Sequence, residues 1–206
     1  MQAILDRAKS LVANLIVMGT HGRGGLDRLV LGSVTEKVLR KASCPVLTVP
    51  PPVSGPPAEA PLLFKRILCA LDFSDWSMKA LTYALALAEE ADARLYVMHV
   101  LEGFRAEEMT AYPDFDLSRY TQHLEQDAQA RLQKAIPEGA RTWCEPVEVL
   151  SSGRAYREIL REAQEQDVHL IVMGVHGRNP VDLMLFGSTT HHVIRASTCP
   201  VLTLRG

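Results

Sequence analysis

The hydrophobic positions of this chain fall into short runs, separated by longer stretches in which apolar residues recur every three or four positions. Consecutive apolar residues are typical of strands buried in a parallel sheet, and the wider spacing is typical of the helices that cover one. Strands are therefore expected over residues 15–18, 46–49, 67–71, 95–101, 142–150, 169–173 and 201–204. Helices are expected to begin near Ser33 and Ser74 and to span residues 4–11, 117–135, 153–164 and 188–196.

Strands and helices alternate regularly from residue 64 to the end of the chain. This alternation predicts an α/β fold, a five-stranded parallel open sheet with helices on both faces of the Rossmann-like kind. Glu145 and Pro146 fall at the start of the expected third strand of this sheet, where a proline favours an edge position or a bulge.

A glycine motif that follows one strand occurs twice in the chain. Gly19, Gly22, Gly32 and Ser33 have the pattern G-x2-G-x9-G-S, and residues 174–188 repeat it. Aligning each residue from 4 to 49 with the residue 155 positions later needs no gap, and 22 of the 46 aligned positions are identical. Chance does not give such agreement, so the chain contains an internal repeat.

The repeat and a proline-rich stretch divide the chain into three parts. Residues 1–49 repeat only the last two βα units and predict a partial domain that lacks its N-terminal half. Residues 50–61 include six prolines and predict an extended linker. Residues 62–206 contain all five strands and predict a complete domain.

Composition excludes several classes of function. Of the 206 residues 47% are hydrophobic and 22% charged, with a net charge of −2, which fits a globular protein and argues against a general nucleic-acid or anionic-membrane surface. The sequence shows neither a membrane-spanning run nor a signal peptide, so a cytoplasmic location is expected.

The four cysteines show no CxxC pairing, so neither a zinc site nor a redox motif is indicated. Cys44 and Cys199 each lie before a proline at the entrance to a short apolar strand and are expected to act as small buried hydrophobes. His191 and His192 are adjacent rather than four residues apart, which argues against a metal site there, and no metal site is predicted.

The chemistry of the glycine motif points to a phosphate group. In open α/β sheets ligands bind at the carboxyl ends of the strands, where Asp72 and Gly174 are both expected. Gly187, Ser188 and Thr189 would present backbone amides at a helix N-terminus, which favours an anion. The Walker sequence G-x4-G-K-[ST] is absent from the chain, so the motif is not a P-loop.

Several motifs together resemble the universal stress protein family. They are the repeated glycine motif, Asp72 after the first strand of residues 62–206, the pair His99 and Val100 ending the second, and the closing sequence C-P-V-L from Cys199. The resemblance implies a tandem member with an N-terminally truncated first domain and an adenine nucleotide alpha hydrolase-like fold. It also implies the ATP-binding subtype, because that motif distinguishes the members that bind ATP and both copies keep it.

The resemblance further implies which residues form an ATP site, with or without magnesium. Asp72 and its neighbours would face adenosine, Val100 would contact adenine through its main chain, and the glycines would approach ribose and phosphate. The implied set in the second copy is Ala70, Leu71, Asp72, Val100, Met173, Gly174, Gly177, Arg178, Gly187, Ser188, Thr189 and Thr190. In the first copy it is Gly19, Gly22, Gly32 and Ser33, with no counterpart of Asp72 or Val100, so a complete site there would need another chain.

The resemblance also implies a partner for the last strand, which in the family pairs with its equivalent in another subunit. Residues 201–204 form an apolar strand that would otherwise be an exposed edge. We expect either a homodimer or an intrachain pseudo-dimer in which Val46–Val49 pairs with Val201–Leu204.

Several residues have two readings at this stage. Asp72 is either a ligand contact or an acid that supports a helix N-terminus. His176 and His21 are either catalytic or ordering groups of their loops, and Arg178 and Arg23 are either phosphate contacts or solvated. His99 is expected to be a buried histidine with its hydrogen bonds satisfied.

The leading functional hypothesis is an ATP-binding, nucleotide-dependent regulatory module of a stress response. Phosphoryl transfer needs a positioned nucleophile or base, and the sequence assigns neither, so no catalytic residue is predicted. A slow ATPase or phosphotransferase using His176 and Asp72 is the enzymatic alternative. The other alternative is an interaction scaffold that holds no nucleotide.

Overall fold

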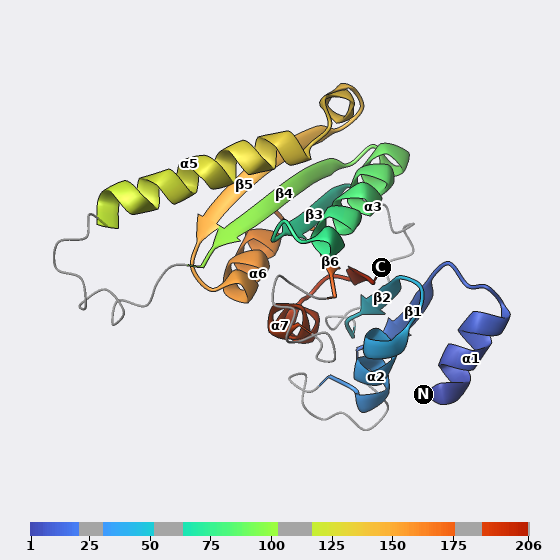
Figure 1. The fold of residues 1–206 in the computed structure, drawn as a ribbon. Coiled ribbons are helices and arrows are strands. Elements are labelled where there is room, and N and C mark those ends of the chain that lie inside the picture. Colours follow the sequence, from blue (N-terminus) through green and yellow to red (C-terminus); the bar gives the residue numbers. More distant parts are fainter. Residues whose placement is uncertain (21–30, 52–63, 103–116, 176–186, 206) are drawn as a thin grey trace.

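The computed structural model describes residues 1–20, 31–51, 64–102, 117–175 and 187–205. Helices and strands alternate along them (Figure 1). In chain order they are α1 (Gln2–Ser10), β1 (Ile16–Gly19), α2 (Ser33–Lys41), β2 (Val46–Val49), β3 (Arg66–Leu71), α3 (Asp75–Ala91), β4 (Arg94–Leu101), α5 (Leu117–Ala135), the 3₁₀ helix η1 (Glu138–Thr142), β5 (Glu145–Ser152), α6 (Ala155–Glu165), β6 (Leu170–Gly174), α7 (Ser188–Ala196) and β7 (Val201–Leu204).

The expected elements are present, with one boundary to correct. The strand expected from residue 142 begins at Glu145, because Glu138–Thr142 forms a 3₁₀ turn instead. The Thr142 hydroxyl donates to the Gly139 carbonyl, 2.6 Å away, which closes that turn. Polar side chains that bond to nearby backbone compete with strand pairing, and the alternation of the sequence did not show this local bond.

The seven strands of the described segments belong to one mixed sheet with the order β1-β2-β7-β6-β3-β4-β5. The five strands from β3 to β7 are mutually parallel, as the alternation predicted. Strand β5 lies at an edge, where its proline is tolerated. Strand β6 lies on the opposite side of β3 from β4, so the strand order reverses between β3 and β6.

The first two strands join the sheet through an antiparallel pairing of β2 with β7. Val46 lies opposite Thr203, and Thr48 lies opposite Val201. The Thr48 hydroxyl donates to the Val201 carbonyl, and the Thr203 hydroxyl donates to the Val46 carbonyl. The donor–acceptor distance is 3.1 Å in both bonds. These bonds are related by an approximate twofold axis, so the intrachain pairing expected from the sequence is present.

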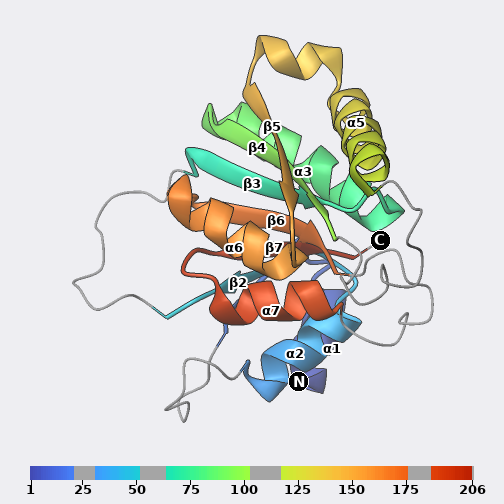
Figure 2. The same ribbon diagram turned by 90° about the vertical axis from the view of Figure 1, so that its left-hand side faces the viewer.

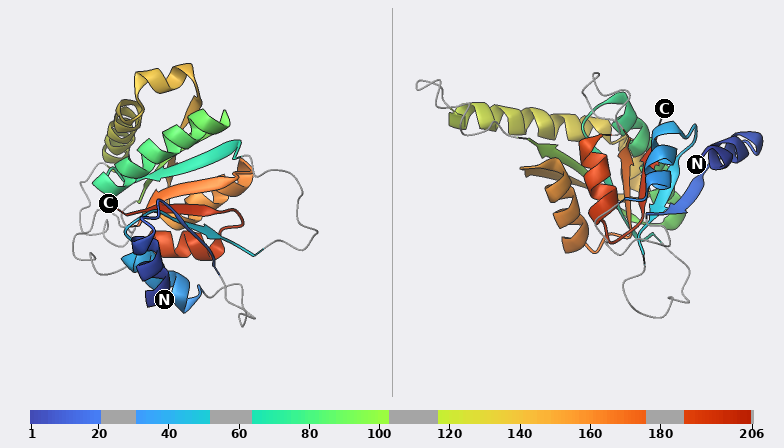
Figure 3. Two further views of the ribbon diagram at one scale, coloured as in Figure 1. Left: turned by 90° about the vertical axis from the view of Figure 1, so that its right-hand side faces the viewer. Right: turned by 90° about the horizontal axis from the view of Figure 1, so that it is seen from below.

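Helices cover both faces of the sheet. Helices α2, α6 and α7 pack on one face, around Val38, Ile159 and Ile194 (Figure 2). Helices α3 and α5 pack on the other face, around Leu81 and Leu132, and α3 crosses that face in Figure 3. The sheet is therefore the middle layer between two hydrophobic cores.

The cysteines lie within these layers as free thiols. Cys44, Cys69 and Cys144 are buried, as predicted for Cys44, and Cys199 is half-buried. Burial raises the pKa of all four thiols above the ordinary value. In the described segments, every helix is too short or too polar to span a bilayer.

One face of β1 is left uncovered, although its counterpart in β6 is buried. Val172 on β6 lies under α3 and is 0% exposed, whereas Val17, 155 positions earlier, is 59% exposed. Leu15 and Val49 on the same side of the sheet are also exposed. The same apolar pattern therefore has opposite environments in the edge strand β1 and in the central strand β6.

This contrast predicts different effects of the same substitution. Val172→Ala should lower the free energy of unfolding by about 2 kcal/mol, because it removes two methyl groups from a closed core. Val17→Ala should change it by less than about 0.5 kcal/mol, because Val17 is already exposed. Urea unfolding measures both, and equal losses would contradict the difference in burial.

Helices α2 and α7 lie side by side and bring His191 close to charges from both (Figure 2). Burial lowers the pKa of His191, Glu36 on α2 opposes that shift, and the positive charges of His192, Arg195 and Arg40 add to it. The folded protein therefore favours the neutral imidazole more than the unfolded chain does.

A pH dependence of stability follows from this shift. Below the ordinary value of 6.5 the unfolded chain takes up a proton at His191 that the folded protein resists, so stability should fall as pH decreases through this region. His191→Gln should flatten the profile between pH 7 and 5. An unchanged profile in this variant would rule out the His191 environment as the cause.

Candidate functional site

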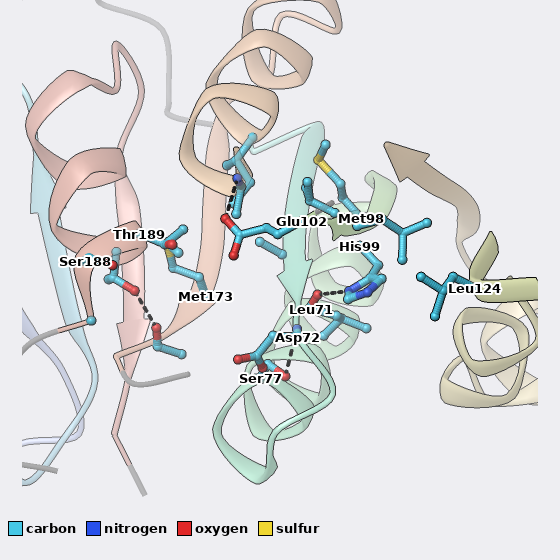
Figure 4. Close-up of a pocket in the computed structure, with 18 of the residues that line it drawn as sticks. Leu71, Asp72, Ser77, Met98, His99, Glu102, Leu124, Met173, Ser188 and Thr189 are labelled. Atoms are coloured by element: carbon cyan, nitrogen blue, oxygen red, sulfur yellow. Dashed lines mark hydrogen bonds between the residues drawn. The ribbon is translucent and has the colours of Figure 1, made fainter. Parts of the chain in front are cut away.

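A cavity of about 520 Å³ lies at the carboxyl ends of β3, β4 and β6, next to the N-terminus of α7. This is the edge of the sheet at which strand order reverses, the usual position of ligand sites in open α/β folds. Figure 4 shows side chains of several elements pointing into it. Its volume is within the range of small-molecule sites.

The end of β3 places Asp72 at the wall of this cavity. Asp72 Oδ1 accepts hydrogen bonds from the Ser74 amide, 3.0 Å away, and from the Ser74 hydroxyl, 2.6 Å away. The Ser74 hydroxyl also accepts from the Ser77 amide and caps α3, as predicted. Asp72 therefore supports the start of a helix and lines the cavity at the same time.

The residue after Asp72 has an unusual backbone conformation. Phe73 has φ = 62°, which is uncommon for a bulky residue. Its ring lies 4.5 Å from the ring of His99 and under the guanidinium of Arg131, at 4.2 Å. These contacts from β4 and α5 hold the turn that aims the Asp72 carboxylate.

His99 is a buried residue of β4 with a structural partner. Its Nδ1 donates to the Leu71 carbonyl, 2.7 Å away, at the end of the neighbouring strand. This confirms the prediction of a buried histidine with a satisfied hydrogen bond. The bond joins the two strand ends that carry Asp72 and Val100.

Gly174 ends β6 in direct contact with the first turn of α3. A Cβ atom at this position would lie 3.0 Å from the Trp76 Cβ and 3.2 Å from the Ser77 backbone nitrogen. Backbone atoms cannot swing away as a side chain can, so this tight packing favours glycine. The sequence suggested close approach of a ligand, and the structure adds a reason that lies within the protein.

The N-terminus of α7 faces the cavity through Ser188, Thr189 and Thr190. The His191 amide donates to the Gly187 carbonyl, so the amides of the three residues before it precede the first bond of the helix. The Gly187 amide itself donates to the Val175 carbonyl, 3.1 Å away. The helix end thus offers amides and two hydroxyl groups to an anion.

The Thr190 hydroxyl is committed to the protein. It donates a buried hydrogen bond to the Gly174 carbonyl, 2.9 Å away, and this bond holds α7 against the end of β6. The Thr35 hydroxyl makes the equivalent bond to the Gly19 carbonyl, also 2.9 Å away. The hydroxyl shared by both copies of the motif therefore has a structural role.

The predicted residues gather as follows. Ten of the twelve in the second copy line the cavity, namely Ala70, Leu71, Asp72, Val100, Met173, Gly174, Gly187, Ser188, Thr189 and Thr190. The other two, Gly177 and Arg178, lie outside the described residues, as do Gly22, His21, Arg23 and His176. Gly19, Gly32 and Ser33 lie at β1 and α2, away from this cavity.

Other lining residues were not predicted. They are Ser77, Met98, His99, Leu101, Glu102, Tyr120, Leu124, Ala155 and Ile159. Glu102 could have been found, because it follows a buried strand by one residue and a strand end is where ligands bind. The residues of α5 and α6 reach the cavity only through the packing of these helices, which the sequence did not show.

Comparison with known proteins shows one family throughout. The model of the universal stress protein family matches residues 2–50 and 63–205. Universal stress protein YxiE of Bacillus subtilis is 33% identical over 150 residues, which is 69% of this chain and all of that protein. A universal stress protein of Mycobacterium tuberculosis is 30% identical over 199 residues, 94% of this chain and 62% of that protein.

Solved structures agree. The crystal structure of a universal stress protein from Archaeoglobus fulgidus has a TM-score of 0.63 and 28% identity, and the match covers 99% of this chain and 64% of that one. The chain therefore spans less than two thirds of the length of the archaeal and mycobacterial relatives.

The two threonine bonds generate a prediction. Thr190→Val should lower the free energy of unfolding by about 1–3 kcal/mol, because the buried Gly174 carbonyl loses its donor. Thr35→Val should have a smaller effect, because Gly19 is exposed and water can replace the hydroxyl. Thr190→Ser retains the donor and is the control. Equal, small losses by urea unfolding for both valine variants would contradict this role.

Proposed function

The chain belongs to the universal stress protein family, and on that premise we propose that it binds ATP in the cavity between β3, β4, β6 and α7 as a nucleotide-dependent regulatory module of a stress response. The observation that carries the proposal is the meeting, in one cavity, of a helix N-terminus with the Asp72 carboxylate.

The phosphate end of the proposed site is the N-terminus of α7. Backbone amides before the first helical bond, together with the helix dipole, stabilise negative charge. The hydroxyls of Ser188 and Thr189 supply further hydrogen-bond donors at the same helix end. Gly177 and Arg178 of the glycine motif complete this end in the proposal, and magnesium enters as the counter-ion of the phosphates.

The nucleoside end of the proposed site lies toward β3 and β4. Asp72, held by Ser74, would accept hydrogen bonds from ribose hydroxyls. The main chain at Val100 would contact adenine, and the apolar side chains of Met98 and Leu124 would cover its faces. A cavity with apolar walls and a few placed polar groups is the usual form of such a site.

The regulatory role concerns association and shape rather than chemistry. We propose that residues 1–49 and 62–206 act as a partial and a complete domain, and that β2 takes the place on β7 that a second subunit would otherwise occupy. Gly19, Gly22, Gly32 and Ser33 would form a second phosphate cradle without an adenosine side.

The protein is proposed to be cytoplasmic. Its free thiols are typical of proteins in a reducing compartment and support this location.

Titration with ATP, ADP and AMP by isothermal calorimetry tests the proposal. The expected result is one site per chain, with affinity that falls as phosphates are removed. Failure of the wild-type protein to bind any of the three would overturn it.

A matched pair of substitutions locates the site. Thr189→Glu places a negative charge at the second residue of α7 and should weaken ATP binding about fivefold or more, because like charges about 4 Å apart repel by on the order of 1 kcal/mol or more. Val34→Glu places the same charge at the equivalent residue of α2, in the copy that lacks an adenosine side, and should leave the affinity of the complete site unchanged. A carboxylate in the first turn stabilises a helix, so neither substitution is expected to unfold the protein. A loss of ATP affinity would therefore not be explained by unfolding.

A further inference from the structure

Glu102 lines the cavity at the carboxyl end of β4. It is the first residue after β4, and its side chain projects into the cavity, between Met173 and Met98 in the view of Figure 4. It is exposed in the folded protein, so its carboxylate is accessible to a ligand.

The carboxylate of Glu102 has a fixed orientation. Its Oε1 accepts a hydrogen bond from the amide of Ala155, 3.0 Å away, the first residue of α6. An acid at this position is favourable to the helix N-terminus. Among the described residues Oε2 makes no hydrogen bond, so one oxygen is anchored by the protein and the other is available.

The order of the strands places Glu102 at the base end of the proposed nucleotide. Gly174 ends β6, Asp72 follows β3, and Glu102 follows β4, so the three lie in this order across the sheet. Neighbouring strands lie about 4.8 Å apart, which separates the first and last by roughly 10 Å. With phosphates on α7 and ribose at Asp72, the base is the group that reaches Glu102.

We propose that Glu102 selects the base, by accepting a hydrogen bond at Oε2 from the exocyclic amine of a 6-aminopurine. This inference rests on the proposed function and assigns the ligand class of the same site. A 6-oxopurine would instead present a carbonyl oxygen at position 6 to the carboxylate, and neither of these two groups can donate. Guanine pairs with a carboxylate through two parallel bonds from its N1–H and its 2-amine, which need both oxygens to face the base, and Oε1 is turned toward the Ala155 amide.

The test compares the dissociation constants of ATP and inosine triphosphate, which differ at position 6 in having an amine or an oxygen. The wild-type protein should bind ATP about 10- to 100-fold more tightly, the range expected when a polar group is left unpaired. Glu102→Gln keeps an oxygen for the Ala155 amide and can offer an amide donor to a 6-oxo group. It should lower the ratio about tenfold or more, by weakening ATP and strengthening inosine triphosphate.

Glu158→Gln is the control variant. Glu158 is a neighbouring acid of α6 that bonds to Ser151 and Arg161 and does not line the cavity, so this variant should keep the wild-type ratio. Equal wild-type affinities for the two nucleotides, tighter binding of GTP than of ATP, or an unchanged ratio in Glu102→Gln would each overturn the role of Glu102 and leave ATP binding standing. Absence of binding to every purine triphosphate would overturn the proposed function and this inference together.

Discussion

The close contact between the end of β6 and the first turn of α3 positions the rest of the site. Gly174 has no side chain, so the backbone of β6 reaches Trp76 and Ser77, and the Thr190 hydroxyl then fastens α7 to the Gly174 carbonyl. The N-terminal amides of α7 and the Asp72 turn that precedes α3 are thereby brought to one cavity. A larger residue at this position would push apart the two elements whose proximity makes the site, with an overpacking cost of about 1–3 kcal/mol.

Much of the fold could be predicted from the sequence, because the order of apolar runs and amphipathic stretches is a local property. The five parallel strands and the Ser74 cap were predicted from such patterns and are present. The pairing of Val46–Val49 with Val201–Leu204 came from the resemblance to the family and is also present. The start of β5 was misplaced, because a hydroxyl that closes a local turn leaves no mark on the alternation.

The residues that line the cavity were predicted where they lie at strand ends and at a helix start, because ligands of open α/β sheets bind at these positions. Residues such as Leu124 and Ile159 were missed because apolar residues on a helix look alike whether they face a core or a cavity. The roles of Thr190 and Gly174 also needed coordinates, since each depends on a contact with a backbone atom elsewhere in the chain.

The antiparallel contact between β2 and β7 has a consequence for how the molecule is made. The Thr203 hydroxyl and the Val46 carbonyl that it meets are separated by 157 positions in the chain. Synthesis proceeds from the N-terminus, so β1 and β2 leave the ribosome long before their partner strand exists. Contacts of this separation form slowly, because a long loop must close first. Although β1 and β2 can pair with each other, the edge of β2 that meets β7 therefore stays open until the last residues of the chain have emerged.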